Sequence, residues 1–360
     1  MLSRPAAKLL MMVALVATSS VTAAQEGAPV ADPLPQLTPD RVYALDAALE
    51  RILQEFAIPG LAVGIVENGE PVYMRGFGVR DKGADQPVNA HTLFHVASIT
   101  RTFTAAATMQ LVERGQLALT DSIADSSVTI AQLLTRDDAA FDALAGIIEG
   151  TAHQKFSEYM KTRVLDAAGM VESTFEIPLA ANNVAWPHVG KVFARRAPNY
   201  PWDEKAIPRA GLSASVADLT RWAAVHVSRD PSLLPPEAYD AMFKRVGDGE
   251  RAHIAMALGW QLEHHGSEWL PSLATRGSGF SSLLTLYPSQ QRAIVILSNG
   301  EMTPEKEIRS IIESILAGES YLTPKPSLLM RSDFQWAFGG LLAMSLLLIA
   351  VTVHRRRRPG

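Results

Sequence analysis

A long apolar segment close to the C-terminus constrains the chain more than any other feature. Residues 336–353 are apolar or small, and four consecutive arginines at 355–358 follow them. A helix of this length rises about 27 Å, close to the thickness of the hydrocarbon core of a bilayer. Arginine clusters beside a spanning helix stay on the cytoplasmic side. The sequence therefore predicts a single transmembrane helix over 336–353, a cytoplasmic basic tail over 354–360 and a main domain outside the cytoplasm.

The N-terminus has the order of segments that is typical of a secretory signal. Arg4 and Lys8 precede an apolar run over 9–17, and small residues continue to Ala24. We interpret 1–24 as a signal peptide; an uncleaved anchor is the alternative, although the apolar run is short for a membrane span. Prolines in 25–38 and 322–335 indicate two linkers. The predicted folded domain is then 39–321, periplasmic or extracellular, and held at the cell membrane.

Composition excludes several classes of protein. The chain contains no cysteine, which excludes disulfides, thiolate metal sites and a cysteine nucleophile. Without the basic residues of the two end segments, which hold no acidic residue, the formal net charge falls from −4 to about −10 and disfavours binding to nucleic acid. We predict no cofactor and no metal, because His264 and His265 lack further ligands at a suitable spacing and are expected in a solvated turn.

Hydrophobic periodicity predicts strands at both ends of the domain and helices between them. The pair Asn68-Gly69 between apolar runs over 61–66 and 71–79 indicates a hairpin. Two further strands are expected over 281–287 and 292–297. The expected helices cover 39–56, 99–114, 130–134, 140–149, 155–168 and 216–227, with one more from residue 303. Strands around a helical middle predict an α+β fold with an inserted helical region.

One segment of the domain resembles a known family. Residues 92–104 read TLFHVASITRTFT, which is similar to the nucleophile segment of the serine β-lactamases and penicillin-binding proteins. Further similar segments follow in the order of that family: QLVERGQLALTD at 110–121, AAGMVESTF at 167–175, AGLS at 210–213, LGW at 258–260 and GFSS at 279–282. The resemblance covers nearly all of 40–317. It implies an antiparallel sheet packed against helices, with a cleft between them.

The resemblance implies that Ser98 is the nucleophile position. In that family a serine that begins a helix attacks a carbonyl carbon, and a lysine one turn further, on the same face, takes its proton. The residue three positions after Ser98 is Arg101. Its guanidinium keeps its proton near neutral pH, so Arg101 supplies positive charge but cannot act as a general base.

The second catalytic motif of the family is also changed. A Tyr-x-Asn motif would precede the segment FDALAGIIE at 141–149, and Arg136, Asp137 and Asp138 stand at that place. Part of the stretch that the family carries between Leu134 and this segment is missing as well. We therefore expect both the tyrosine and a part of the cleft wall to be absent.

The third motif of the family, a lysine or histidine followed by x-Gly, is expected on the last strand of the cleft at 273–277. Neither Leu273 nor Thr275 can supply a cation or donate a proton there. Gly277 and Ser278 remain as candidates for the residues of the cleft strand that bind the oxyanion.

Two functional hypotheses follow from these changes. In the first, hydrolysis is impaired, the domain acts as a binding or regulatory protein at the cell envelope, and Arg101 pairs with Asp138 or Asp137. In the second, Ser98 is an active nucleophile, Asp138 is its base, and the backbone N–H groups of Ser98 and of a residue near Ser278 bind the oxyanion. In the second hypothesis, Arg101 beside Asp138 would lower the pKa of the Asp138 carboxylate and make Asp138 a weak base.

The ligand expected under both hypotheses is a peptidoglycan-like peptide, an ester or a β-lactam, and a protein partner is the alternative for a binding protein. His95 lies between apolar residues and is expected to be a packed strand residue. Asp218 is expected at the start of a helix. The segment GFSSL at 279–283 is not a Gly-x-Ser-x-Gly elbow, because Leu283 replaces the final glycine.

Overall fold

The structure is a computed structural model, and it describes residues 37–123, 126–136, 138–176, 178, 182–190, 194–246, 254–323 and 344–345. Contacts divide the chain into residues 1–33 and 34–360, and every described element belongs to the second unit.

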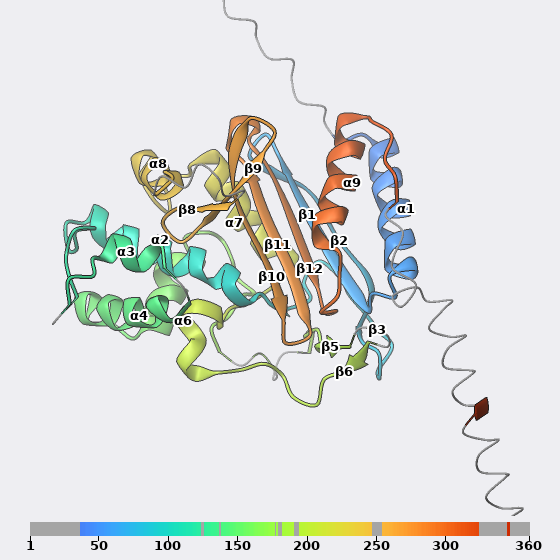
Figure 1. Cartoon of the computed structure of the whole chain (residues 1–360), viewed down its shortest axis with the longest axis horizontal. Helices are drawn as coiled ribbons and strands as arrows, with labels where there is room; N and C mark the ends of the chain where they lie inside the picture. Colours follow the sequence, from blue (N-terminus) through green and yellow to red (C-terminus); the bar gives the residue numbers. More distant parts are fainter. Residues whose placement is uncertain are drawn as a thin grey trace, which may run out of the picture. The chain divides into compact units, whose positions relative to one another are not determined.

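An eight-stranded sheet forms the centre of this unit (Figure 1). The strand order is β3-β2-β1-β12-β11-β10-β9-β8, and each neighbouring pair is antiparallel. The strands are β1 (Gly60–Glu67), β2 (Glu70–Asp81), β3 (Gln86–Pro87), β8 (Ile254–Met256), β9 (Gln261–His265), β10 (Glu268–Gly277), β11 (Phe280–Tyr287) and β12 (Arg292–Ser298). The first and last strands of the chain, β1 and β12, therefore pair with each other in the middle of the sheet.

The predicted hairpin between β1 and β2 is confirmed. Asn68 and Gly69 both have positive φ, 53° and 77°, which a two-residue turn between twisted antiparallel strands requires. Every residue of β1, β11 and β12 is buried, because helices cover both faces of the sheet. These three strands therefore lack the alternation of polar and apolar residues that a half-exposed strand shows.

Helices α1 (Pro39–Glu55) and α9 (Glu305–Ala317) lie side by side on one face of the sheet (Figure 1). The Thr38 hydroxyl accepts a hydrogen bond from the Arg41 amide at the start of α1, which caps the helix. The two helices and the sheet share one apolar core, whose helical members include Leu45, Leu49, Ile52, Ile308, Ile312 and Leu316.

Helix α7 (Val216–Ser228) packs against the opposite face, on β1, β2, β11 and β12. Gly64 of β1 allows this close approach, because a Cβ atom there would lie 1.9 Å from Thr220 Oγ1. Together with this face of the sheet, α7 and the other helices form a second, larger apolar core. The other helices are α2 (Thr100–Glu113), α3 (Ile130–Leu134), α4 (Asp138–Ala152), α5 (Phe156–Tyr159), η2 (Met160–Leu165), α6 (Ile207–Ala210) and α8 (Pro236–Phe243).

In the part of the chain that the structure describes, the connections include two short two-stranded sheets and several 3-10 turns. Strand β4 (Phe94–His95) pairs with β7 (Ser213–Ala214), and β5 (His188–Val189) pairs with β6 (Arg195–Arg196). The 3-10 turns include η1 (Ala97–Ile99), η4 (Glu204–Ala206) and η5 (Pro288–Gln290).

The α+β class and the inserted helical region are confirmed, and one local prediction is wrong. The helix expected over 155–168 is present over 156–165 as α5 followed by the π-helical η2, whose Arg163 carbonyl accepts a hydrogen bond from Gln110 Nε2 at 2.8 Å. A wider turn frees such a carbonyl for an outside partner. His264 and His265 lie at the exposed end of strand β9 and not in a turn, because they pair with Trp269 and Glu268 of β10.

The predicted signal peptide at 1–24, the tail at 354–360 and most of the linkers at 25–38 and 322–335 lie outside the described residues. So does the predicted transmembrane helix at 336–353, apart from residues 344–345. Among the described residues, no helix combines the length and the apolar character that crossing a membrane requires.

Candidate functional site

Ser98 borders a cavity of about 650 Å³ between the helical region and the β10–β11 end of the sheet. This volume is in the range of small-molecule binding sites. Four of the residues that the sequence singled out line it, namely Ser98, Arg101, Gly277 and Ser278. Asp138, the fifth, is the first residue of α4, but its side chain is outside the described part of the chain. Its pairing with Arg101 and its role as a base therefore stay predictions.

The backbone around Ser98 is held by the short sheet of β4 and β7. His95 of β4 pairs with Ser213 of β7, and the Val96 amide donates to the Leu212 carbonyl at 3.1 Å. Ala97 has φ +47°, a left-handed conformation that a residue with a Cβ atom rarely adopts. The chain turns sharply there and places Ser98 in η1, directly before α2. Ser98 thus begins the helix that carries Arg101, as the resemblance predicts.

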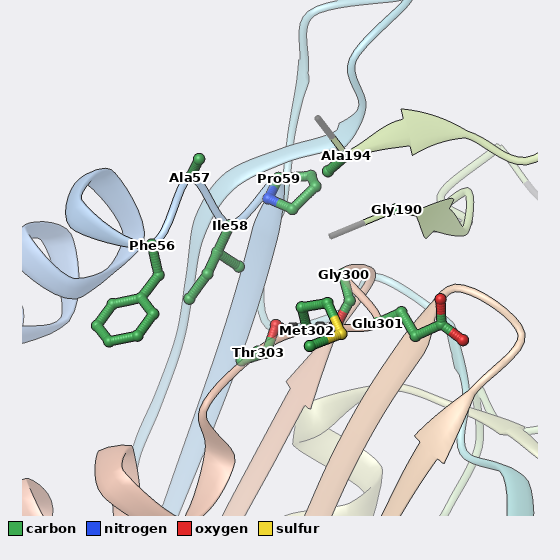
Figure 2. A pocket seen from close by; sticks show the side chains of 10 residues that line it. All are labelled: Phe56, Ala57, Ile58, Pro59, Gly190, Ala194, Gly300, Glu301, Met302 and Thr303. Carbon is green, nitrogen blue, oxygen red and sulfur yellow. Dashed lines mark hydrogen bonds between the residues drawn. The ribbon is translucent and has the colours of Figure 1, made fainter. Parts of the chain in front are cut away.

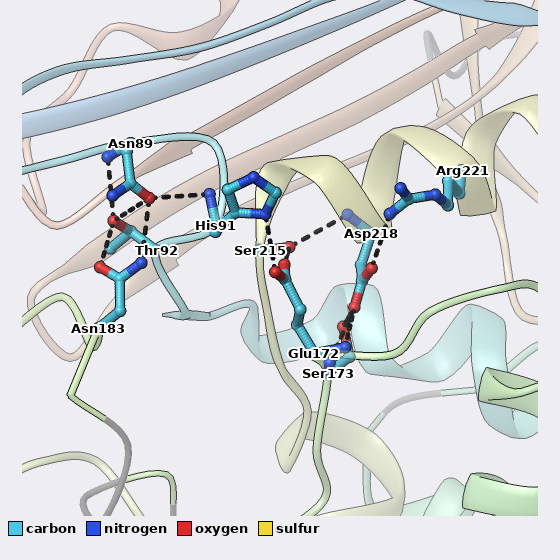
Figure 3. Close-up of polar contacts among 9 residues, drawn as sticks. All are labelled: Asn89, His91, Thr92, Glu172, Ser173, Asn183, Ser215, Asp218 and Arg221. Atoms are coloured by element: carbon cyan, nitrogen blue, oxygen red, sulfur yellow. Dashed lines mark hydrogen bonds and ion pairs between the residues drawn. The ribbon is translucent and has the colours of Figure 1, made fainter.

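A polar cluster fixes the loop that leads into β4 (Figure 3). Thr92 Oγ1 donates to Asn183 Oδ1 at 2.8 Å and accepts from the Asn89 amide at 3.0 Å. Asn183 Nδ2 donates to Asn89 Oδ1 at 3.0 Å and closes the cluster. Since Thr92 lies six positions before Ser98, these bonds limit the freedom of the nucleophile segment.

Asp218 anchors a second cluster in Figure 3. Ser215 caps α7 by accepting from the Asp218 amide, so the predicted place of Asp218 in the first turn of a helix is confirmed. Its fully buried carboxylate accepts hydrogen bonds from the amides of Glu172 and Ser173, both at 2.8 Å, and from the Ser173 hydroxyl at 2.9 Å. Asp218 therefore ties the segment after η2 to α7, and its part in the fold is structural.

Arg101 extends from α2 into the wall of the cavity. Its side chain is 8% exposed, its Nε donates to the Ser98 carbonyl at 3.4 Å, and its guanidinium carbon lies 5.8 Å from the centre of the Phe141 ring. Gly259 lets the chain pack closely on the same helix, because a Cβ atom there would lie 2.2 Å from the Ala105 Cβ. Arg101, one turn after Ser98, is thus a positively charged side chain in a fixed position, and it cannot accept a proton.

The turn between β10 and β11 forms the other side of the cavity. Gly277 pairs with Phe280, and Gly277, Ser278 and Gly279 all have positive φ. A Cβ atom on Gly279 would lie 2.6 Å from the Pro187 Cβ, so the turn packs closely on the chain before β5. The backbone of this turn is where the sequence predicts the second oxyanion donor, a role that stays a prediction.

Strand β10 presents no cation to the cavity from the positions that the sequence indicated. Leu273 is buried in the larger core, and Thr275, two residues further on the same face, lines the cavity. Arg276 borders the cavity as well, but its guanidinium binds Glu305 at 2.7 Å and the Thr303 carbonyl at 2.9 Å. These contacts keep the positive charge of the Arg276 guanidinium beside Glu305, at the start of α9.

His95 is the residue of this site whose place the sequence reasoning missed. It is a packed strand residue, as expected, but it also lines the cavity. Its Nδ1 has no hydrogen-bond partner, and burial lowers the pKa of the imidazole to about 4. The ring packs against Tyr200 and Phe280, with centroids 6.3 Å and 6.0 Å away. No local pattern signals this contact, which depends on the β4–β7 pairing.

The charged side chains among the described residues that line the cavity are both cationic. Arg101 and Arg276 border it, and none of the described residues that line it is acidic. Asp142 of α4 pairs with Arg209. Because a cation near a cavity favours anions inside it, the site is suited to a ligand that carries a carboxylate.

A second hollow lies at the end of the sheet, lined in part by Phe56, Pro59, Gly300 and Met302 (Figure 2). Its volume of about 20 Å³ is enough for about one water molecule. It therefore does not compete with the Ser98 cavity as a ligand site.

A comparison with protein families gives a match to the family described as Beta-lactamase, over residues 45–136 and 137–317. The chain belongs to the beta-lactamase family. The two matched segments of this beta-lactamase family protein meet between Leu134 and α4, where the sequence predicts that a stretch of the family is missing.

One protein sequence and two solved structures illustrate what this beta-lactamase family protein is similar to. Protein flp of Staphylococcus aureus (strain N315) is 24% identical over 386 residues, which cover 88% of this chain and 74% of that protein. An octameric penicillin-binding protein homologue from Pyrococcus abyssi has a TM-score of 0.69 and 21% identity, covering 78% of both chains. D-alanine carboxypeptidase AmpC from Burkholderia cenocepacia has a TM-score of 0.66 and 22% identity, covering 78% of this chain and 99% of that one.

Proposed function

We propose that this protein binds an acyl ligand with a carboxylate group in the Ser98 cavity, and that it turns the ligand over slowly or not at all. The observation that carries the proposal is Arg101, a cation in the wall of a ligand-sized cavity at the position from which the Ser98 proton would be taken. Each lost acid-base group typically lowers a rate by about 10²–10⁴-fold. The retained cavity and the replaced base together favour binding over catalysis.

The ligand classes that fit are a β-lactam, a peptidoglycan-like peptide or an ester with a free carboxylate. Each has a carbonyl group for Ser98 and a negative charge for Arg101. The similar solved structure named as a D-alanine carboxypeptidase supports the peptide class. With a signal peptide at 1–24 and a transmembrane helix at 336–353, the domain would act at the cell envelope as a binding or regulatory protein; a protein partner is then a further ligand.

An active serine hydrolase is the second candidate function. It is favoured by the strained turn at Ala97, which presents Ser98 at the start of α2 beside an open cavity. Strained backbone of this kind is often found at functional sites. In this candidate Ser98 is acylated and the acyl group is released by water, with Asp138 as the predicted base.

Binding of a fluorescent penicillin to the full chain tests the proposal. The measurement uses a Ser98→Ala background, in which acylation is excluded, and follows fluorescence anisotropy. We expect Arg101→Met to weaken binding by about 10-fold or more, because a charge-assisted hydrogen bond to the ligand carboxylate is lost. Arg196→Met, at an exposed arginine stacked on Trp186, is the matched control and should bind as the background does.

The proposal fails if the folded Ser98→Ala protein does not bind the penicillin, a carboxylate-bearing peptide or an ester of that kind. It also fails if Arg101→Met and Arg196→Met bind equally well, because the cavity cation would then have no part in recognition.

A further inference from the structure

The strained segment that presents Ser98 also brings a histidine to the same cavity. His95 and Ser98 both line it, and only Val96 and the left-handed Ala97 separate them. The β4–β7 pairing fixes the backbone of His95, and the rings of Tyr200 and Phe280 fix its side chain. An imidazole is thus held at the border of the cavity, close in sequence to the nucleophile.

One nitrogen of this imidazole, Nδ1, is enclosed by the fold without a partner, so the side of the ring that borders the cavity is the one that can take a proton. Its side chain is 8% exposed, and no group of the described protein bonds to Nδ1. Buried polar atoms nearly always have a partner, so an exception beside a cavity calls for an explanation. Tyr200 does not supply a partner, because its hydroxyl is paired with the Ser213 hydroxyl at 3.3 Å.

We propose that His95 accepts the proton of Ser98, directly or through one water, when an acyl ligand occupies the cavity. This rests on the proposed function in that the ligand carbonyl lies beside Ser98. The Ser98 Oγ–H proton moves to the imidazole while the bond from Oγ to the carbonyl carbon forms. The bond from that carbon to the leaving group then breaks, and the leaving group takes the proton from the imidazolium. His95 returns to its neutral form, and Ser98 carries the acyl group.

The charges around the cavity agree with this role. Burial keeps His95 neutral near pH 7, so that it can accept a proton. The other titratable groups around it do not compete: burial raises the pKa of the Tyr200 hydroxyl, and Arg101 and Arg276 stay protonated. The same burial makes His95 a weak base, so the expected acylation is slow, in agreement with impaired turnover.

The test measures the rate constant with which a fluorescent fluorophosphonate labels the full chain, from about pH 6 to about pH 9, with Ser98→Ala as the blank. In this reaction the Oγ–P bond forms, fluoride leaves and the Ser98 proton passes through His95 to water. We expect His95→Phe and His95→Gln to lower the rate constant by about 10-fold to 100-fold. His264→Gln, at an exposed histidine of β9, is the matched control and should label as the wild type does.

The pH profile separates a base from a packing residue. The wild-type rate constant should change little across this window, because the imidazole is neutral throughout. The rate constants of the two variants should rise with pH, because hydroxide replaces the missing base. His95→Phe keeps an aromatic ring between Tyr200 and Phe280 and removes an unpartnered buried polar atom, so its melting temperature should not fall. If His95→Phe fails to fold, His95→Gln carries the test.

Two outcomes overturn the proposal: a folded His95 variant that labels with the wild-type rate constant and pH profile, or a wild type that shows no Ser98-dependent labelling. Neither affects the binding proposal, since the penicillin measurement uses Ser98→Ala and needs no acylation. Conversely, if the penicillin does not bind, the binding proposal fails, and the fluorophosphonate measurement still tests the role of His95.

Discussion

At the scale of single residues, both candidate functions depend on Ser98 and Arg101. They lie one helical turn apart in η1 and α2, and both border the same cavity. The arrangement that the family uses for nucleophile and base is therefore retained, and the difference lies in the basicity of one side chain. A guanidinium keeps its proton, whereas a lysine amine in a partly buried site can lose it.

Arg101→Lys should therefore raise the rate at which a fluorophosphonate labels Ser98, by about 10-fold or more. The lysine would stand at the position of the base, and its burial would favour the neutral amine. Arg114→Lys, at the exposed end of the same helix, is the control and should leave the rate unchanged. An Arg101→Lys protein that is folded and no faster than the wild type would show that the lost base does not limit the reaction.

The sequence predicts some of these residues and not others for physical reasons. Ser98 and Arg101 follow from the resemblance of residues 92–104 to the nucleophile segment of the family, and Gly277 and Ser278 from the expected place of its third motif. His95 reaches the cavity through the β4–β7 pairing and the left-handed Ala97, which are properties of the tertiary structure. The apolar neighbours of His95 in the sequence therefore predict that it is buried, but not that it also lines the cavity.

At the scale of elements, an ion cluster fastens α9 to the edge region of the sheet. Glu263 of β9 accepts hydrogen bonds from Arg309 at 2.7 Å and from Lys306 at 3.1 Å. Burial alone would raise the pKa of Glu263, but the two cations outweigh it and hold the pKa at about 2. Glu263 therefore stabilises the fold in its charged form.

This predicts a specific acid dependence for Glu263→Gln. A carboxyl whose pKa is lowered in the folded state stabilises it above the pKa of the unfolded chain, about 4.5, and that contribution is lost as the pH falls towards 2. Near pH 7 the variant should be less stable than the wild type by about 1–2 kcal/mol. The control is Glu70→Gln, at an exposed carboxyl of β2. Urea unfolding at several pH values measures the difference, and a Glu263→Gln deficit that persists unchanged near pH 3 would contradict it.

The elements that sequence periodicity predicts are those with strong local signals. The β1–β2 hairpin follows from Asn68-Gly69, and α1 and α7 follow from their apolar stripes and caps. Strands β8 and β9 are short and partly exposed, so their pairing with the sheet decides their structure. The π-helical η2 likewise depends on the Gln110 amide from another helix.

At the scale of the whole molecule, the cavity is assembled from segments that are far apart in the chain. Its lining comes from residues 95, 97, 98, 101, 210, 261 and 274–278, which the β10–β11 turn and the start of α2 bring together. The order of motifs predicts the family and the approximate place of this site. It does not predict the volume, or that Arg276 directs its charge towards Glu305, because both depend on packing between distant elements.

Turnover per molecule tests the central claim most directly. The full chain and its Ser98→Ala variant would each be mixed with an excess of a chromogenic cephalosporin and of a chromogenic ester that carries a carboxylate. Our account predicts at most about one equivalent of product per molecule of wild type, released slowly, since no efficient base activates Ser98 or the water that would release the acyl group. Sustained release of many equivalents, absent in Ser98→Ala, would contradict it and identify an active hydrolase.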